Sequence, residues 1–196
     1  INSDGLALEA VLHLPSSFGK APAVAVCHPH PRYGGNMNSG IVVGLSEALR
    51  ESGIAALRFN HRGVGGSEGN FAVGVDWALA DAWAAVDALS LDDRIDATRV
   101  GIAGYSFGAS VALLASLESD TILAMATIAC PASVFKELGA RELLAPKLFV
   151  LGDQDHDFPV DQFRFLAQRY SEPKQVSVLS GADHFFRGHE TALGEI

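Results

Sequence analysis

Cysteine is scarce in this chain, which has only Cys27 and Cys130 among its 196 residues. The sequence has no C-x-x-C pair and no cysteine–histidine spacing typical of a zinc site. We therefore expect two reduced, buried thiols, with no metal ion and no cofactor. Hydrophobic residues make up 48% of the chain, so it can bury a core of its own without disulfides.

Basic residues are also in short supply, since 14 Lys and Arg face 23 Asp and Glu and the net charge is -9. Because nucleic-acid-binding proteins normally carry a basic patch, we expect no nucleic-acid partner and no binding to an anionic membrane. No apolar run approaches the roughly 20 residues of a membrane-spanning helix. The sequence shows no signal peptide, and we expect a cytoplasmic protein.

Short apolar runs alternate with helical patterns, and no repeat or linker interrupts them. The runs predict strands at residues 6–14, 21–27, 54–60, 100–104, 123–130, 148–151 and 174–179. The patterns predict helices at 38–51, 76–89, 107–117 and 160–170, and a last one after residue 186. This alternation predicts a single α/β domain over residues 1–196, a three-layer α/β/α sandwich with a mostly parallel sheet. In such sheets the chemistry lies at the carboxyl ends of the strands.

The segment GYSFG, residues 104–108, follows an apolar strand and opens an alanine-rich helix. This is the setting of a nucleophile elbow, in which Ser106 is the nucleophile. We expect glycine to be required at positions 104 and 108, because the turn and the neighbouring strand leave no room for a side chain. The alternative is that Ser106 only caps the helix in an ordinary strand-to-helix turn.

A serine nucleophile needs a base and an acid, which in this architecture follow it in the order acid, then histidine. Of the histidines after Ser106, His184 comes just after the last strand and is the predicted base. His156 is too close in sequence to the acid, and His189 falls in the predicted last helix.

The acid comes from the segment GDQDHD, residues 152–157, which follows the preceding strand. Asp153, Asp155 and Asp157 all qualify, and the residues alone do not choose among them. The two that are not used are expected to bind backbone N–H groups or to cap the next helix.

Two backbone N–H groups are needed for an oxyanion hole. Phe107, directly after the nucleophile, supplies one. The second should come from HPHPR, residues 28–32, where the prolines have no N–H. The N–H of His30 lies in the turn just past the strand and is the predicted donor, while the His28 side chain is expected to brace the loop.

The glycine-rich segment HRGVGGSEG, residues 61–69, lacks the lysine of a phosphate-binding loop. We interpret it as a structural loop in which Ser67 or Glu68 satisfies backbone groups.

Taken together, GYSFG, GDQD and DHFF resemble the nucleophile, acid and histidine segments of the α/β-hydrolase family. RFNHRGVGGSEG and HPHPRYGGNMN are similar to further segments of that family, the second to the oxyanion loop of a small lidless subgroup near the dienelactone-hydrolase-like and serine-peptidase-like branches. The resemblance covers residues 5–184. It implies Asp155 as the acid and agrees with His30 as the oxyanion donor. The chain departs from many members of the family, which insert a cap domain between the strands that here end at Cys130 and start at Lys147. Only about fifteen residues separate these two positions, so we expect no cap domain.

These observations predict a serine hydrolase of the carboxylesterase kind, with Ser106, His184 and Asp155 as catalytic residues and a small or exposed acyl substrate. A thioesterase, acyltransferase or peptidase would use the same residues, and a noncatalytic binding protein could keep the same fold. An uncapped site leaves room for a second copy of the chain in a homodimer.

Overall fold

The computed structural model describes residues 1–16, 19–72, 74–139 and 141–196. Its centre is a seven-stranded sheet in the order β3-β5-β4-β6-β7-β8-β9, in which β3 is antiparallel and the other strands are parallel. The strands are β3 (Ala10–His13), β4 (Ala21–Cys27), β5 (Ala55–Phe59), β6 (Ile95–Tyr105), β7 (Met125–Ile128), β8 (Lys147–Gly152) and β9 (Lys174–Leu179). A separate hairpin is formed by β1 (Asn2–Ser3) and β2 (Leu6–Ala7).

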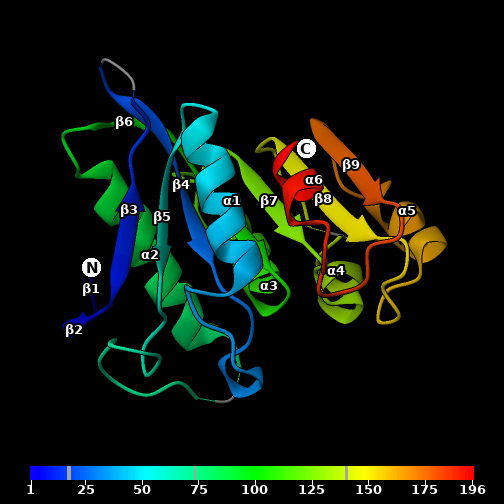
Figure 1. Cartoon of the computed structure of the whole chain (residues 1–196), viewed down its shortest axis with the longest axis horizontal. Helices are drawn as coiled ribbons and strands as arrows, with labels where there is room; N and C mark the ends of the chain where they lie inside the picture. The colour runs from blue at the N-terminus through cyan, green and yellow to red at the C-terminus, as the bar shows by residue number, and fades with distance from the viewer. Residues whose placement is uncertain (17–18, 73, 140) are drawn as a thin grey trace.

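Helices cover both faces of this sheet, which confirms the predicted three-layer α/β/α architecture. Figure 1 shows α1 (Gly40–Glu51) and α6 (Glu190–Gly194) in front of the sheet. The opposite face carries α2 (Asp76–Ser90), α3 (Phe107–Leu117), α4 (Ala132–Leu138) and α5 (Val160–Ala167). The central strands have apolar residues on both faces because both faces are buried, and small side chains such as Ala82 and Ala112 let α2 and α3 approach them closely.

Several boundaries differ from those that the sequence predicts. The run 6–14 is divided between β2 and β3, because the carboxylate of Glu9 turns away to accept hydrogen bonds from Asn60 Nδ2 (2.7 Å) and the Gly66 N–H (2.8 Å). The strand predicted at 100–104 begins earlier, at Ile95. The helix predicted at 160–170 ends at Ala167.

Two short helices have no counterpart in the predictions. They are the 3₁₀ turn η1 (Pro31–Tyr33) and α4, which lies between β7 and β8. At seven residues, α4 is too short to form a cap domain. Within the described residues, no helix is both long enough and apolar enough to cross a membrane.

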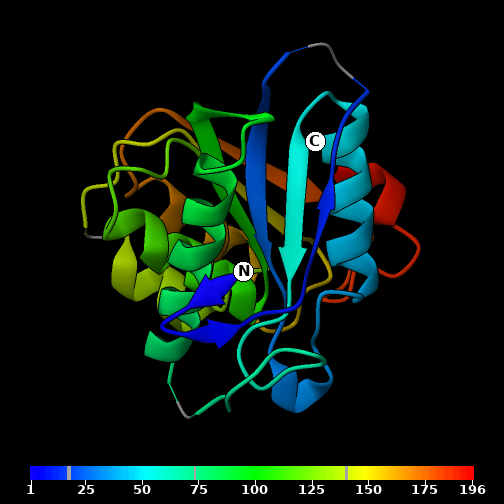
Figure 2. The ribbon, with the colours of Figure 1, turned by 90° about the vertical axis from the view of Figure 1, so that its left-hand side faces the viewer.

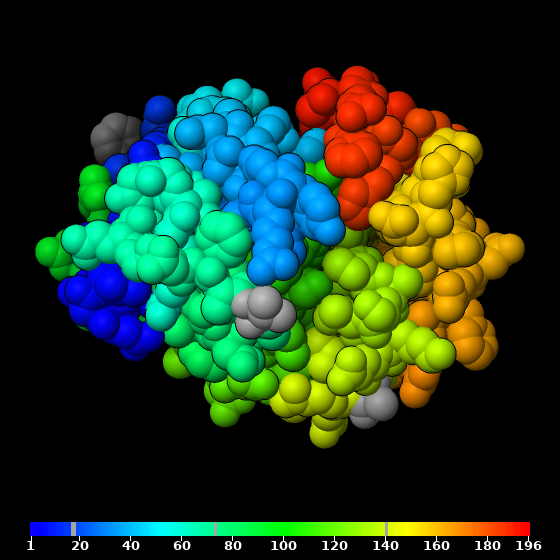
Figure 3. Space-filling view, turned by 90° about the horizontal axis from the view of Figure 1, so that it is seen from below, coloured from blue at the N-terminus to red at the C-terminus, as the bar shows by residue number. Residues whose placement is uncertain are grey.

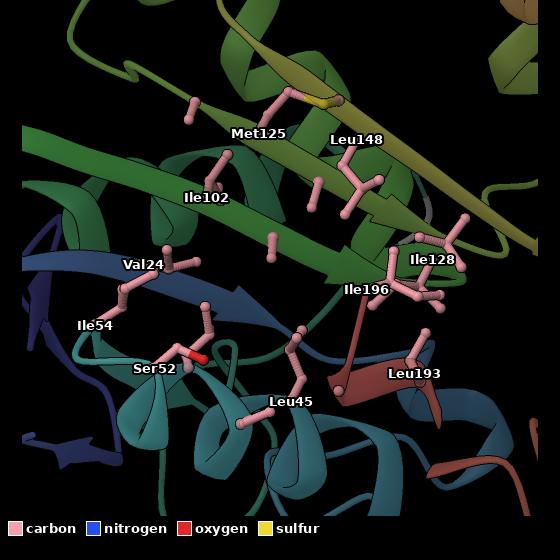
Figure 4. Close-up of a pocket in the computed structure, with 17 residues that line it drawn as sticks. Val24, Leu45, Ser52, Ile54, Ile102, Met125, Ile128, Leu148, Leu193 and Ile196 are labelled. Carbon is pink, nitrogen blue, oxygen red and sulfur yellow. The ribbon is translucent and has the colours of Figure 1, made fainter. Parts of the chain in front are cut away.

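An apolar hollow of about 340 Å³ lies between α1, α6 and the face of the sheet. Figure 4 shows Leu45 from α1, Leu193 from α6 and Leu148 from β8 pointing into it. This hollow is on the α1 side of the sheet and shares no lining residue with the cleft at the carboxyl ends of the strands.

The loops that follow the parallel strands gather at one end of the sheet. In Figure 2, β5 ends above the loop of residues 60–72, which lies beside the segment that contains η1. The Met37 N–H donates to Asn60 Oδ1 at 2.8 Å and joins these two loops. Figure 3 views this end of the molecule, which is hollowed where the segments near residues 35, 130 and 185 meet.

Candidate active site

Ser106 lies at the turn between β6 and α3 with φ 56° and ψ -115°. A positive φ is uncommon for a residue with a side chain and costs on the order of 1–3 kcal/mol. A Cβ at Gly104 would overlap the carbonyl oxygen of Gly108, and a Cβ at Gly108 would overlap that of Cys27 in β4. The turn therefore requires both glycines, for the steric reasons that the sequence predicted.

The three predicted catalytic side chains are joined by hydrogen bonds. Ser106 Oγ lies 3.1 Å from His184 Nε2, and His184 Nδ1 lies 2.9 Å from Asp155 Oδ2. Asp155 is buried, whereas the other two side chains are partly exposed. Because a carboxylate can only accept, Nδ1 carries the proton and leaves the Nε2 lone pair facing the serine hydroxyl.

The loops after β8 and β9 hold the acid and the histidine next to each other. Asp153 Oδ1 accepts a hydrogen bond from the Gly181 N–H at 2.7 Å, and the Gln154 N–H donates to the Ala182 carbonyl oxygen at 2.9 Å. Asp157 donates its N–H to Asp155 Oδ1 at 2.9 Å. Asp153 thus binds a backbone N–H, as expected of an aspartate that is not the acid.

The charges of the pair shift both pKa values. The hydrogen bond from His184 to Asp155 raises the pKa of His184 above its ordinary value of 6.5. Burial opposes ionisation of Asp155, but the hydrogen bonds from His184 and the Asp157 N–H, together with the charge of His184, outweigh it and lower the pKa of Asp155. The arrangement therefore favours a carboxylate that stabilises a positively charged imidazole.

His30 and Phe107 lie side by side next to the serine. Their rings are 4.7 Å apart, and the Phe107 ring stacks on Trp77 of α2 with centroids 5.7 Å apart. Neither backbone N–H donates to another group in the part of the chain that the structure describes. Both donors thus remain free, as an oxyanion hole requires.

Ser106, His184 and Asp155 open into a cleft of about 1080 Å³. One side is formed by the loop after β4, which includes His30 and Tyr33, and the other sides by the segments around residues 131, 157 and 185. The Arg187 guanidinium lies 4.6 Å from the centre of the Phe185 ring at this rim.

Asp155, Asp157 and His184 could each offer one ligand atom to a metal ion, since these atoms lie within 4.8 Å of one another. However, the Nδ1–H of His184 already donates to Asp155, so this nitrogen has no lone pair for a metal. The geometry fits a proton-transfer pair better than a metal centre.

The glycine-rich loop after β5 is structural, as predicted. Ser67 Oγ donates to the Asn60 carbonyl oxygen at 2.7 Å and accepts the Glu9 N–H at 2.9 Å. Glu68 Oε2 accepts the Ala7 N–H at 2.8 Å. The side chain of His28 also has two hydrogen bonds, which confirms that it braces its loop.

Sequence reasoning missed a buried ion pair behind the site. Asp81 of α2 is fully buried and accepts hydrogen bonds from the N–H and Nε of Arg62, at 2.8 and 2.9 Å. Burial opposes ionisation of Asp81, but the polar groups of His61 and Arg62 outweigh it and lower its pKa to about 2. No spacing signal links Arg62 to Asp81, because the contact depends on how α2 packs against the loop.

Comparison with known proteins agrees with this geometry. Residues 4–155 match the family model of the X-Pro dipeptidyl-peptidase (S15 family). An uncharacterized protein of Rickettsia prowazekii is 34% identical over 175 residues, which cover 85% of this chain and 73% of that protein.

Two solved structures are also similar. An α/β serine hydrolase homologue from Coxiella burnetii has a TM-score of 0.88 and 33% identity, covering 100% of this chain and 92% of its own. An α/β serine hydrolase without lid from Xanthomonas campestris has a TM-score of 0.79 and 26% identity, covering 99% and 91%. The chain therefore belongs to the X-Pro dipeptidyl-peptidase (S15) family, among the lidless α/β serine hydrolases.

Proposed function

We propose that this hydrolase cleaves carboxylic esters of small or exposed acyl groups, with Ser106, His184 and Asp155 as its catalytic triad. The observation that carries the proposal is the unbroken chain of hydrogen bonds from Ser106 Oγ through the His184 ring to Asp155, with distances of 3.1 and 2.9 Å. The three residues line a cleft that is large enough for a small-molecule substrate.

In the first half of the reaction, Ser106 Oγ attacks the ester carbonyl carbon while His184 Nε2 takes the hydroxyl proton. Asp155 stabilises the imidazolium that forms. The leaving alkoxide then departs with the proton from Nε2, and an acyl group remains on Ser106. In the second half, a water molecule attacks the acyl carbon while His184 Nε2 takes its proton. The bond from the acyl carbon to Ser106 Oγ then breaks, Nε2 returns the proton to Oγ, and the acid product leaves.

The N–H groups of Phe107 and His30 would stabilise the negative oxygen of both tetrahedral intermediates. Removing one such donor costs about 100-fold or more in rate in this chemistry. The rings of His30 and Phe107 lie 4.7 Å apart, so the two residues that carry the proposed donors are neighbours beside Ser106.

The test is labelling with a small fluorophosphonate, which requires no knowledge of the substrate. Intact-mass analysis should give one adduct, and peptide mapping should place it on Ser106. Ser106→Ala should abolish the adduct, and His184→Ala should slow it strongly. Turnover of p-nitrophenyl esters should fall with the adduct. If Ser106→Ala kept full esterase activity, the proposal would be wrong.

A second candidate is a peptidase that releases dipeptides. It is favoured by the match to the X-Pro dipeptidyl-peptidase family and by two carboxylates on the cleft rim, Asp157 and Glu190, which could attract a free amino terminus. A dipeptide X-Pro-p-nitroanilide and its N-acetylated form separate the two candidates. A peptidase would cleave the free form faster, whereas an esterase would cleave neither at a rate close to that of an ester.

Thioesterase, acyltransferase and binding roles predict different results in the same assays. A thioesterase would prefer a thioester over the matched oxygen ester, and an acyltransferase would transfer the acyl group to an added alcohol or amine in preference to water. A binding protein would show no turnover above the Ser106→Ala control.

A further inference from the structure

The imidazole of His28 is fully buried beneath the loop that follows β4. Its Nε2 accepts a hydrogen bond from the His61 N–H at 3.2 Å, and its Nδ1 lies 2.7 Å from the Pro29 carbonyl oxygen. A backbone N–H only donates and a carbonyl oxygen only accepts. The partners therefore assign one tautomer, in which Nδ1 carries the proton and donates it to Pro29.

The carbonyl of Pro29 and the N–H of His30 belong to the same peptide unit. In a planar trans peptide these two groups point in opposite directions. The Pro29–His30 bond is not among the cis bonds of the described chain. The hydrogen bond from His28 holds the carbonyl toward the interior, and the same bond therefore directs the His30 N–H away from it.

Building on the proposed function, we infer that His28 is a positioning residue that orients the His30 N–H toward the oxyanion of the reaction. His28 does not touch the substrate. It acts through the Pro29–His30 peptide plane, which it fixes from the buried side.

This loop has few other ways to fix that peptide. Pro29 and Pro31 have no N–H. The carbonyl of His30 accepts hydrogen bonds from the N–H groups of Tyr33 (3.0 Å) and Gly35 (3.1 Å), which fix the peptide after His30. His28 supplies the matching hydrogen bond for the peptide before it. Gly35 lies against the same Pro29 carbonyl, so closely that a Cβ there would overlap it.

The rest of the surroundings keep this arrangement constant. Burial lowers the pKa of His28 to about 3, so its ring stays neutral across the range in which His184 titrates. The His61 ring lies 4.8 Å from it, and beyond His61 is the Asp81–Arg62 ion pair. The bond from Nδ1 to Pro29 therefore does not depend on pH where the enzyme works.

Two substitutions test the roles of the two ring nitrogens of His28 one at a time. His28→Gln keeps an amide atom near the place of Nε2 but has no donor at the place of Nδ1. His28→Asn carries an amide nitrogen at the place of Nδ1 and loses the link to His61. If His28 orients the donor, His28→Gln should lower kcat on a p-nitrophenyl ester by about 100-fold with little change in KM. His28→Asn should recover most of this loss, to within roughly tenfold of the native kcat.

Three further readouts distinguish positioning from a purely structural role. The kcat is counted per Ser106 that the fluorophosphonate labels at completion, so that misfolded protein does not enter. The affinity for phenylboronic acid, whose tetrahedral adduct places an oxygen in the same hole, should fall with kcat. The apparent pKa in the pH profile of kcat/KM should stay unchanged, because His28→Gln leaves His184 and Asp155 in place.

Two results would overturn the inference. One is a native kcat and boronic-acid affinity in His28→Gln. The other is an equal loss in His28→Gln and His28→Asn that follows their melting temperatures. Failure of the proposed function is detected separately, in the native protein, which would then show neither an adduct on Ser106 nor ester turnover. In that case the inferred role of His28 would also be wrong.

Discussion

The hydroxyl of Tyr105 donates a hydrogen bond to the backbone carbonyl oxygen of His184 at 3.0 Å. Tyr105 is the residue before the proposed nucleophile, and His184 is the proposed base. One end of β6 thus carries the serine and at the same time holds the loop that brings the histidine to it. Tyr105 is largely buried, and burial raises the pKa of its hydroxyl to about 12, so it remains a donor throughout the working range.

Tyr105→Phe removes this single hydrogen bond and little else. We expect kcat on a p-nitrophenyl ester to fall by roughly tenfold or less, since one hydrogen bond is worth about 1 kcal/mol net. The fluorophosphonate should still label Ser106, more slowly than in the native protein. Steady-state kinetics and labelling rates measure both effects, and a native labelling rate would show that the His184 loop does not need this bond.

The pH dependence of ester hydrolysis should follow His184. As a base it must be neutral, so kcat/KM should rise as the pH rises through its pKa, which the hydrogen bond to Asp155 holds above 6.5. Asp155→Asn removes that effect and should move the inflection to lower pH, while kcat falls by about 10⁴-fold. Asp157→Asn is the comparison variant and should move the inflection much less, because Asp157 raises the pKa of His184 through its charge only and is a smaller cause than the hydrogen bond from Asp155. An unmoved inflection in Asp155→Asn would remove Asp155 from the triad.

The turn at Ser106 should tolerate no side chain at Gly108. Gly108→Ala places a Cβ against the backbone of Cys27 and His28. We therefore expect the free energy of unfolding to fall by about 3 kcal/mol or more, and esterase activity to be lost as well. Gly44→Ala in α1 is the control, because nothing lies within 4 Å of its Cβ position and alanine favours a helix by up to about 1 kcal/mol. Urea unfolding of both variants measures the difference. A Gly108→Ala protein of native stability would contradict the close approach of α3 to β4.

The buried Asp81 should make the fold sensitive to acid. Its pKa in the folded protein is about 2, below the ordinary value of 3.8. A lowered pKa stabilises the fold above the ordinary value, and this stability is lost as the pH falls from about 4 toward 2. The shift corresponds to about 2 kcal/mol. Asp81→Asn should reduce this part of the acid sensitivity and also lower stability at pH 7, because it removes the buried charge partner of Arg62 and leaves only the exposed Asp4 as its ion-pair partner. Urea unfolding at several pH values in this range measures the free energy of unfolding of both proteins. If this free energy depended on pH equally in the native protein and in Asp81→Asn, the prediction would be wrong.

Much of the fold follows from local pattern. The apolar runs and the alternation with helices predict the parallel sheet and its two helical layers, because both signals come from neighbours along the chain. Some of what was missed depends on contacts between distant residues. The division of the run 6–14, for example, occurs where Glu9 turns to bind Asn60 and Gly66. No property of residues 6–14 alone indicates this division.

The features of the site also differ in whether the local sequence predicts them. Ser106 and its glycines are readable because the steric needs of the turn lie within five residues. The residues alone could not choose Asp155 over Asp153, since the choice depends on Gly181, which binds the Asp153 carboxylate from another loop. The links from Tyr105 to His184 and from His28 to Pro29 have no spacing signal. They become visible only when strand ends are placed side by side.

The order of the strands has a consequence for refolding. The proposed site draws His30, Ser106, Asp155 and His184 from the ends of β4, β6, β8 and β9, and β9 is the edge strand that contains the last residues of the sheet. A folding intermediate that lacks β9 can have a complete nucleophile turn and native helix content, yet its serine has no base. Recovery of ester hydrolysis after dilution from denaturant should therefore lag behind the circular dichroism signal, and enzymatic activity becomes a sensor of the final docking step.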